Sequence, residues 1–364
     1  MKIIVNATII NNKRAGIGNY GYNLISNLVN EKDVNFTFIL QKCIKIDYNN
    51  VHYTKNYIKS YQRIIDEQLF LPLKYRKYDL VHFIDYSSPI INIGIPFIVT
   101  IHDLSFYKYP EMFSQMSRTL KQRLTPLSIK RASLIIADSN STRNDIIEYF
   151  QTAAEKIRVI YPGKPNFRKI NDITIVENIK NKYGIKGRYI LGVCTLEPRK
   201  NLKRLVQAFE IIYKYYNDIY LVLVGQKGWL YDDLMLKIEN SFIKDRIITT
   251  GYISKKELEC IYSGAEVFVY PSLYEGFGLP PLEAMCCGVP VVVSNSSSLP
   301  EVVGDAGIYC DPYSIESIAE SVLSILKNQE IKKHLSIEGI KRSEKFSWQK
   351  AAQKVMEAYR EILE

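Results

Sequence analysis

The order of apolar runs along the chain constrains its fold more than any other feature. Short β-branched runs alternate with longer amphipathic runs, a pattern typical of α/β proteins with mostly parallel strands. In the first half, strands are expected at Lys2–Thr8, Asn35–Leu40, Leu80–Ile84, Phe97–Ile101, Leu134–Ala137 and Arg158–Tyr161. Helices are expected at Gly18–Val29, Arg63–Leu71, Gln115–Lys130 and Ser141–Phe150.

The pattern breaks at Tyr161-Pro-Gly-Lys-Pro-Asn, and the polar stretch from there to about Lys180 is interpreted as an interdomain linker. The alternation then restarts, with strands expected at Tyr189–Val193, Tyr220–Val224, Ile247–Thr250, Val267–Tyr270 and Val289–Val293. Helices are expected at Leu202–Tyr215, Leu234–Ser241, Lys255–Tyr262, Pro280–Cys286, Ile315–Lys327 and from Ser347 to the end. A chain of 364 residues is long enough for two such domains.

The charge and the cysteines exclude several classes of protein. The formal net charge of +10 lies entirely in residues 1–180, while residues 181–364 are balanced. The six cysteines form no C-x-x-C pair and the four histidines have no ligand spacing, so we expect a reduced intracellular protein without disulfides or a zinc site. We expect no signal peptide, because the N-terminus runs straight into the strand-like stretch Lys2–Ile10, and the longest weakly polar run, residues 90–101, is too short to span a bilayer.

A glycine-containing turn follows the first expected strand. It reads Arg14-Ala-Gly-Ile-Gly-Asn-Tyr-Gly and leads into a helix, whose N-terminal amides favour an anion. The spacing is not that of the dinucleotide-binding fingerprint, and a plain strand–helix turn explains it equally well.

Two adjacent cations, Arg199 and Lys200, stand where a helix begins after the strand that ends near Cys194. Positive charge at a helix N-terminus opposes the helix dipole, and a bound diphosphate would offset that cost. A solvated basic surface is the alternative, and the unfavourable position leads us to favour a phosphate site.

The segment Tyr270–Met285 gives the strongest signal. It places Glu275 and Glu283 with seven residues between them around a Gly-Phe-Gly-Leu turn, and Pro280 and Pro281 suit the first turn of a helix. Backbone amides of residues 276–279 are expected to face a ligand there, and the two carboxylates suit sugar and ribose hydroxyls. Complementation of the helix dipole would explain Glu283 alone, but it does not explain the whole segment.

These motifs resemble those of the retaining glycosyltransferases of family 4, over essentially the full chain. The resemblance rests on Gly16-Ile-Gly18, Ile101-His102-Asp103, Ala137-Asp-Ser139, Val159-Ile-Tyr-Pro-Gly163, Glu197-Pro-Arg-Lys-Asn201, Leu223-Val-Gly225, Gly251-Tyr252 and the Glu275/Glu283 pair. It implies a GT-B fold, in which two Rossmann-like domains with parallel sheets face each other across a cleft. Residues 1–165, joined by the helix 347–364, would be the acceptor-binding domain, and residues 166–346 the domain that binds the nucleotide-sugar.

The resemblance also implies roles for individual residues. Catalytic roles fall to His102, which would contact the sugar and the acceptor, and Glu275, which would hold sugar hydroxyls near the anomeric centre. Donor-binding roles fall to Gly16, Gly18, Arg199, Lys200, Gly225, Tyr252, Ile253, Gly276, Phe277, Gly278, Leu279 and Glu283. Arg199 and Lys200 would bind the diphosphate, Glu283 the ribose, and the residues around Gly225 and Gly251–Ile253 the base. A structural histidine at a strand end is the alternative for His102.

One departure from the family concerns the arginine that many members carry just after the glycine of the strand preceding the lysine. This chain has Gly192-Val193-Cys194 there, and Arg199 is the candidate to supply the missing charge. The chain also has no Asp-x-Asp, the usual holder of a divalent ion on nucleotide-sugar phosphates, so we expect no metal and no cofactor. Transfer with the leaving phosphate as base is the family's usual account, and Glu275 is not assigned as a nucleophile.

Donor and acceptor follow only from the resemblance. The Glu-Pro-Arg-Lys-Asn motif is similar to that of bacterial mannosyl- and rhamnosyltransferases of polysaccharide assembly, which favours GDP-mannose over a UDP-hexose and a glycan or lipid-linked glycan as acceptor. A sugar-nucleotide 2-epimerase of the same fold and a non-catalytic binding protein are the alternatives, and the Glu275/Glu283 pair disfavours both.

The basic half raises the question of an anionic partner. Basic and aromatic residues gather in the segments Lys55–Lys77 and Lys108–Arg131, which suits a lipid-diphosphate acceptor or peripheral contact with an anionic membrane from the cytoplasm. Ordinary solvated helix faces explain the same residues. Nucleic-acid binding is not expected, because no binding module accompanies the charge.

Overall fold

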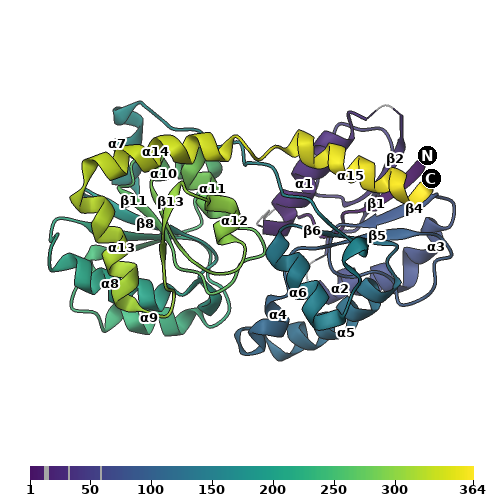
Figure 1. Cartoon of the computed structure of the whole chain (residues 1–364), viewed down its shortest axis with the longest axis horizontal. Coiled ribbons are helices and arrows are strands. Elements are labelled where there is room, and N and C mark those ends of the chain that lie inside the picture. The colour runs from purple at the N-terminus through teal and green to yellow at the C-terminus, as the bar shows by residue number, and fades with distance from the viewer. Residues whose placement is uncertain (12–15, 32, 58–59) are drawn as a thin grey trace. The chain divides into compact units, whose positions relative to one another are not determined.

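The computed structural model describes residues 1–11, 16–31, 33–57 and 60–364, which form two compact units. The first unit contains Met1–Pro110, Ser114–Gly163 and Ser347–Glu364, and the second contains Glu111–Phe113 and Lys164–Phe346. Each unit is built around one wholly parallel sheet with helices packed against it (Figure 1). The predicted α/β class with two parallel sheets is therefore confirmed.

The first unit holds seven parallel strands in the order β3-β2-β1-β4-β5-β6-β7. The strands are β1 Lys2–Asn6, β2 Asn35–Gln41, β3 Val51–Thr54, β4 Leu80–Phe83, β5 Phe97–Ile101, β6 Leu134–Ala137 and β7 Ile157–Val159. The helices are α1 Gly16–Leu28, α2 Ser60–Ile65, α3 Pro72–Tyr75, α4 Ser105–Lys108, α5 Gln115–Arg131, α6 Asn140–Phe150 and α15 Trp348–Leu363, with a π-helical segment at Asp66–Phe70. The strand order reverses between β1 and β4, which is where parallel α/β sheets place their ligands.

The second unit repeats this arrangement with six parallel strands in the order β10-β9-β8-β11-β12-β13. The strands are β8 Tyr189–Val193, β9 Tyr220–Val224, β10 Ile247–Gly251, β11 Val267–Tyr270, β12 Val291–Ser294 and β13 Gly307–Cys310. The helices are α7 Ile173–Lys182, α8 Leu202–Tyr213, α9 Tyr231–Glu239, α10 Lys255–Ser263, α11 Leu279–Cys286, α12 Leu299–Val303, α13 Ile315–Lys327 and α14 Gln329–Ser343. Its strand order reverses between β8 and β11.

The structure corrects three expectations from the sequence. The polar stretch that was interpreted as linker up to Lys180 contains α7, which begins at Ile173 after the capping residue Asp172. The edge strands β3 and β13 were not predicted. The β3 sequence, Val-His-Tyr-Thr, contains no continuous apolar run, and β13, Gly-Ile-Tyr-Cys, is only four residues long and begins with a glycine. Helix α14 was not predicted either, because its few buried residues form no clear apolar face.

The last helix, α15, completes the core of the first unit. It lies beside α1 (Figure 1), and Ala352, Val355 and Met356 are buried in the cluster that contains Leu24 and Phe36. Tyr359 adds a polar contact inside that core, because its hydroxyl lies 2.7 Å from Nδ1 of the buried His82 on β4. Burial lowers the pKa of His82 to about 3, so the ring is neutral and its second nitrogen bonds to the Thr100 hydroxyl.

No helix in the described ranges combines the length and the apolar character that a membrane span requires.

We expect the substitution Tyr359→Phe to lower the free energy of unfolding by about 1–3 kcal/mol, because it leaves a buried ring nitrogen of His82 without a partner. Urea unfolding followed by circular dichroism measures the change. Tyr215→Phe is the matched control, because Tyr215 is 63% exposed, and its effect should stay within about 0.5 kcal/mol. Equal effects of the two variants would contradict a structural role for the His82–Tyr359 contact.

Candidate active site

The loops that follow β8 and β11 meet at the point where the second sheet reverses its strand order. The loop after β8 carries Arg199 and Lys200, and the loop after β11 carries Glu275. These three predicted residues are brought together: Glu275 Oε1 lies 2.6 Å from Lys200 Nζ, and Glu275 Oε2 lies 3.2 Å from Arg199 NH1.

Glu275 is buried, and both of its carboxylate oxygens have partners in this cluster. Its carboxylate also accepts a hydrogen bond from Ser272, and its backbone amide donates to the Ser297 hydroxyl. Burial alone would raise the pKa of Glu275, but the charges of Lys200 and Arg199 outweigh it and hold that pKa below its ordinary value. Glu275 is therefore an ionised acceptor of hydrogen bonds, flanked by two cations.

The structure changes the reason given for the position of the two cations. Arg199 and Lys200 lie in a separate 3₁₀ turn, Pro198–Lys200, and α8 begins only at Leu202. Their charges are compensated by the carboxylates of Glu197, 2.8 Å from Arg199, and Glu275. These ion pairs therefore offset the positive charge that was expected to oppose the dipole of the following helix. The role of Glu197 was not predicted.

Asn201 fixes the turn that presents the cations. Its backbone is left-handed, with φ of 60°, and its side-chain amide donates to the carbonyls of Pro271 and Pro312. These bonds tie the loop after β8 to the loops after β11 and β13. The cations thus stand on a fixed support rather than on a free loop.

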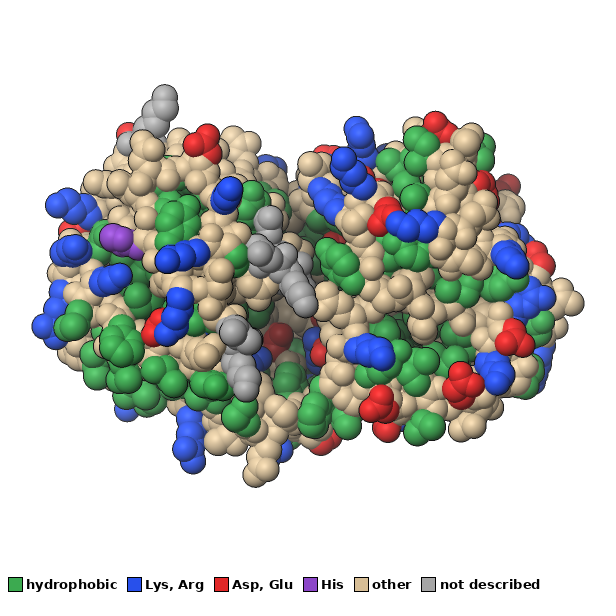
Figure 2. Space-filling view, turned by 180° about the vertical axis from the view of Figure 1, so that it is seen from behind, with side chains coloured by type: hydrophobic (Ala, Val, Ile, Leu, Met, Phe, Trp, Pro, Cys, Tyr) green, Lys and Arg blue, Asp and Glu red, His purple; other side chains and the backbone are tan. Residues whose placement is uncertain are grey.

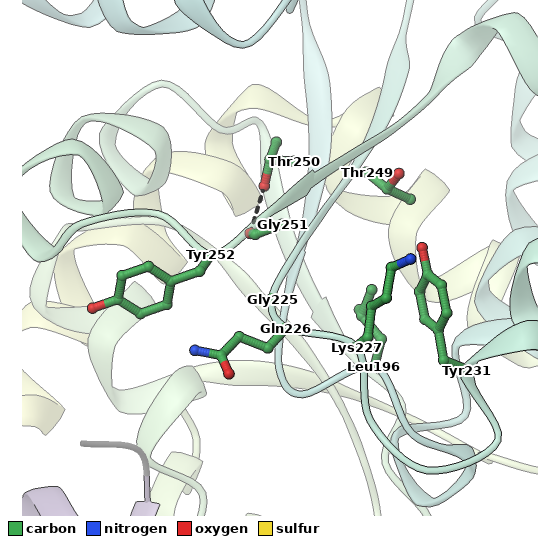
Figure 3. A pocket seen from close by; sticks show the side chains of 9 residues that line it. All are labelled: Leu196, Gly225, Gln226, Lys227, Tyr231, Thr249, Thr250, Gly251 and Tyr252. Atoms are coloured by element: carbon green, nitrogen blue, oxygen red, sulfur yellow. Dashed lines mark hydrogen bonds between the residues drawn. The ribbon is translucent and has the colours of Figure 1, made fainter. Parts of the chain in front are cut away.

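A pocket of about 440 Å³ opens at the same edge of the second sheet. It is lined by Leu196, Gly225, Gln226, Lys227, Tyr231, Thr249, Thr250, Gly251 and Tyr252. In Figure 3, Lys227 and Tyr231 lie together on one side, and Gln226 and Tyr252 on the other. A cavity of this size and mixed polarity suits a small organic ligand.

Gly225 is required where it stands, because a Cβ atom there would lie 1.6 Å from the carbonyl oxygen of Cys194. The loops after β8 and β9 therefore approach each other closely at Gly225, which lines the pocket. Leu196, which lines the pocket, precedes Arg199 by three residues, so the pocket and the cationic turn adjoin along the chain.

Of the predicted base-contacting residues, Gly225, Gly251 and Tyr252 line the pocket, whereas Ile253 is buried next to Tyr252 in the chain. The pocket wall also contains residues that were not predicted, because only the fold brings them there: Gln226, Lys227, Tyr231, Thr249 and Thr250.

The glycine turn before α11 has one buried side chain. Phe277 packs edge-on against Phe346, with ring centroids 5.5 Å apart, so only its backbone is available to a ligand. Gly276 and Gly278 are buried around it, and Leu279 begins α11. Gly278 has a φ of 114°, a backbone conformation that residues with a side chain rarely adopt.

Glu283 lies on the second turn of α11, half-buried, with Oε2 2.9 Å from the hydroxyl of Tyr262. Burial raises the pKa of Glu283 to about 7. Its charge is therefore sensitive to pH near neutrality, unlike that of Glu275.

In the first unit, His102 follows β5 and Asp138 follows β6, at the same edge of the first sheet. His102 Nδ1 lies 2.6 Å from Asp138 Oδ2, and His102 Nε2 lies 2.9 Å from the carbonyl of Ile84. Tyr20 packs edge-on against the ring, with centroids 4.7 Å apart. Tyr20 belongs to α1, which begins at the predicted Gly16 and buries Gly18, whereas Arg14 and Ala15 lie outside the described residues.

His102 is held as a cation. Burial by itself would lower its pKa, but the Asp138 carboxylate, its hydrogen bond and the Ile84 carbonyl raise the pKa of His102 to about 9. Both ring nitrogens can then donate, one to each partner. Asp138 Oδ1 is buried and has no hydrogen-bond partner among the described residues.

A second buried ion cluster, which the sequence did not reveal, lies where the first sheet reverses. Arg63 binds Glu67 and Asp85, each at 2.9 Å, and Glu67 also accepts from Thr8, just after β1. All four side chains are buried. Arg63 and Glu67 are four residues apart, but Thr8 lies 59 residues from Glu67 and Asp85 lies 22 residues from Arg63, so only the fold brings the whole cluster together.

The described residues contain no group of three histidines, cysteines or acidic residues arranged to hold a metal ion.

Two family models match the chain. The model for glycosyl transferases group 1 matches residues 175–342, and the model for Glycosyltransferase Family 4 matches residues 16–164. The O-antigen chain mannosyltransferase B of Escherichia coli is 30% identical over 379 residues, covering 99% of this chain and all of that protein. The chain is a family 4 glycosyltransferase.

Two further comparisons agree with that assignment. The serotype-specific mannosyltransferase WbdA of Escherichia coli is 30% identical over 240 residues, which cover 65% of this glycosyltransferase and 29% of WbdA. The crystal structure of HepE from Anabaena in complex with UDP and glucose aligns with a TM-score of 0.77 at 19% identity, over 99% of both chains. The GT-B fold expected from the sequence is thus confirmed.

The His102–Asp138 pair should make the stability of the glycosyltransferase depend on pH. Because folding raises the pKa of His102 above its ordinary 6.5, the stabilisation is complete below pH 6.5 and is lost as the pH rises through about 9. We expect Asp138→Asn to cost roughly 3 kcal/mol at pH 6 and much less at pH 10.

Urea unfolding of both proteins between pH 6 and pH 10 measures this difference. Asp47→Asn, which changes an exposed carboxylate of the same unit, should follow the wild-type profile. A cost of Asp138→Asn that does not vary with pH would show that His102 is neutral in the folded protein.

Proposed function

We propose that this glycosyltransferase transfers a hexose, with mannose favoured, from GDP-mannose to a glycan or lipid-linked glycan, with retention of configuration and without a metal ion. The observation that carries the proposal is the Arg199–Lys200–Glu275 cluster at the switch point of the second sheet, in which Lys200 and Glu275 are buried and Arg199 is partly buried, near the 440 Å³ pocket along the chain. The choice of mannose is supported by the names of the two Escherichia coli relatives, both mannosyltransferases.

In this proposal, the pocket binds the base of the nucleotide-sugar, and the Arg199–Lys200–Glu275 cluster binds its diphosphate and sugar. The nucleoside base enters the pocket around Gly225 and Tyr252, and the ribose hydroxyls donate to Glu283. The diphosphate binds Arg199 and Lys200, supported by the backbone at residues 276–279, and Gly16 and Gly18 lie at the start of α1 as a further anion contact. No cofactor is needed.

The two cations supply the electrostatic part of catalysis. The bond between the anomeric carbon and the phosphate oxygen breaks with negative charge growing on the diphosphate. Arg199 and Lys200, held in place by Glu197 and Glu275, stabilise that charge without reorganisation. The two fixed cations thereby stabilise the diphosphate charge, as a divalent ion does in enzymes that hold one on the phosphates of a nucleotide-sugar.

Glu275 and His102 are assigned to the sugar. Glu275 is ionised, so it accepts hydrogen bonds from sugar hydroxyls near the anomeric centre. His102 is cationic, and Asp138 at Nδ1 fixes the orientation of its ring. When the donor binds, Nε2–H, which now donates to the Ile84 carbonyl, exchanges that carbonyl for a sugar hydroxyl. The acceptor hydroxyl attacks from the face that the leaving group occupies, and its proton passes to the departing phosphate oxygen, which gives retention.

The first unit is proposed as the acceptor-binding unit, working at the cytoplasmic face of a membrane if the acceptor is lipid-linked.

We expect GDP to raise the melting temperature more than UDP, and GDP-mannose to be turned over faster than any UDP-hexose. A ligand at about 100 times its Kd stabilises by about 2.7 kcal/mol, which thermal-shift measurements detect. Release of nucleoside diphosphate from a panel of donors, with and without acceptor, gives the turnover. A preference for UDP and a UDP-hexose would show that GDP-mannose is not the donor.

Retention of configuration is tested separately, by NMR of the anomeric proton of the product.

Lys200→Ala should lower kcat by at least about 100-fold, because it removes one of the two cations that stabilise the leaving diphosphate. Lys203→Ala is the matched control, since Lys203 is an exposed lysine three residues away whose partner is the surface residue Asp233. Steady-state kinetics with the preferred donor compares them. Near-normal turnover of the Lys200 variant would refute the diphosphate site.

Glu283→Gln should weaken nucleotide binding about tenfold at pH 8, because a neutral amide is a poorer acceptor for ribose hydroxyls. In the wild type, affinity should rise as the pH increases through about 7, where Glu283 ionises, and the variant should lack this rise. Calorimetric titration with nucleoside diphosphate between pH 6 and pH 8.5 measures both. Glu239→Gln, at an exposed carboxylate, should bind like the wild type.

A further inference from the structure

Large apolar side chains are exposed together on one face of the first unit. Leu69, Phe70 and Leu73 are 63%, 64% and 70% exposed, although the neighbouring Glu67 is buried. Ile90 and Ile91, in the loop after β4, are 57% and 49% exposed. Figure 2 shows hydrophobic side chains gathered at the lower left of the left-hand unit, with Lys and Arg side chains near them.

Hydrogen bonds hold the two segments side by side. Gln68 donates to the carbonyl of Ser88 at 3.0 Å and accepts from the amide of Ile90 at 2.7 Å. The guanidinium of Arg131, at the end of α5, donates to the carbonyls of residues 89, 90 and 91. Leu127, one turn earlier on α5, is 42% exposed. We call the set Leu69, Phe70, Leu73, Ile90, Ile91 and Leu127 the apolar patch.

The patch is built on a rigid base. The segment Asp66–Phe70 is π-helical, a rare conformation that is frequently found at functional sites. On its inner side, Glu67 is bound by the buried Arg63, which also binds Asp85 just after β4. These bonds anchor the segment and the start of the β4 loop while the apolar side chains point outward. A contiguous exposed apolar surface on a rigid scaffold is a mark of a docking site.

The charges around the patch are positive. Lys74, Arg76 and Lys77 follow Leu73 and are exposed. Helix α5 carries five Lys or Arg residues and no Asp or Glu. Of the acidic residues nearest in sequence, Glu67 and Asp85 are buried with Arg63, and Asp66 binds Lys55 and Tyr57. Asp79 is exposed and accepts a hydrogen bond from the backbone amide of Lys2, so three exposed cations stand against one exposed carboxylate in residues 74–79.

We propose that the apolar patch inserts into the interface of an anionic phospholipid membrane, with Lys74, Arg76 and Lys77 on the headgroups. Apolar side chains ringed by basic ones match the two forces that hold a peripheral protein on such a surface, apolar burial and attraction to anionic lipid. The proposal corrects the interpretation of the sequence, because Arg63 and Tyr75, which the sequence assigned to the basic surface, are buried. It is independent of the donor, since the patch lies outside the residues assigned to catalysis.

The test is co-sedimentation of the whole chain with vesicles of phosphatidylcholine alone or with 30% phosphatidylglycerol, without donor or acceptor. The wild type should bind the anionic vesicles, and added salt should weaken binding. Leu69→Ser/Phe70→Ser/Leu73→Ser and Lys74→Gln/Arg76→Gln/Lys77→Gln should each weaken it at least about tenfold. Leu236→Ser/Phe242→Ser is the matched control, because it removes two side chains of the second unit that are 62% and 70% exposed, and it should bind like the wild type.

Donor turnover and the unfolding midpoint of each variant show that the fold is intact, since every substituted residue is exposed. Three outcomes would overturn the proposal: no binding to anionic vesicles, equal binding by the wild type and the apolar variant, or equal loss in the control. Analytical ultracentrifugation of the wild type and the apolar variant tests self-association. If the wild type is a dimer, the apolar variant is a monomer and neither binds vesicles, the patch is instead a contact with a second copy of the chain.

Discussion

The pairing of buried charges at the carboxyl ends of the two sheets is the constraint on which the rest of the structure depends. Lys200 and Glu275 are each less than 10% exposed, so neither could be buried without the other. Their pairing draws the loops after β8 and β11 together at the point where the strand order reverses. In the first unit, Arg63 does the same for Glu67 and Asp85, and it thereby fixes the segment that carries the exposed apolar patch.

In the proposed function, the same pairing prepares the second unit for an anion. Positive charges surrounded by protein interact more strongly with a ligand than charges in water do. Glu197 and Glu275 hold the two cations in place, so in this proposal the orientation of the cations is set before the diphosphate binds. The ionised Glu275, the cationic His102 and the pH-sensitive Glu283 then have three different charge states near neutrality, each set by its own surroundings.

Local patterns in the sequence predicted most of the fold and part of the candidate site. Buried strands such as β8 and β11 are continuous apolar runs, and Arg199, Lys200 and Glu275 stand in the turns that follow them. The edge strand β3 and helix α7 were not predicted, because their residues are largely exposed and polar.

The partners of the candidate functional residues were not predicted for another reason. Asp138 meets His102 across 36 residues, and Asp85 meets Arg63 across 22, so only the folded sheet brings them together.

The return of the chain to the first unit has a consequence for biosynthesis. The chain leaves this unit after Gly163 and re-enters at Ser347, and a Cβ atom on Gly163 would lie 2.1 Å from the backbone nitrogen of Trp348, so the two crossings are in contact. On the ribosome, residues 1–163 are made first, yet Leu24, Phe36 and His82 still lack the side chains of α15 that cover them. The first unit can therefore complete its core only after the whole second unit has been synthesised.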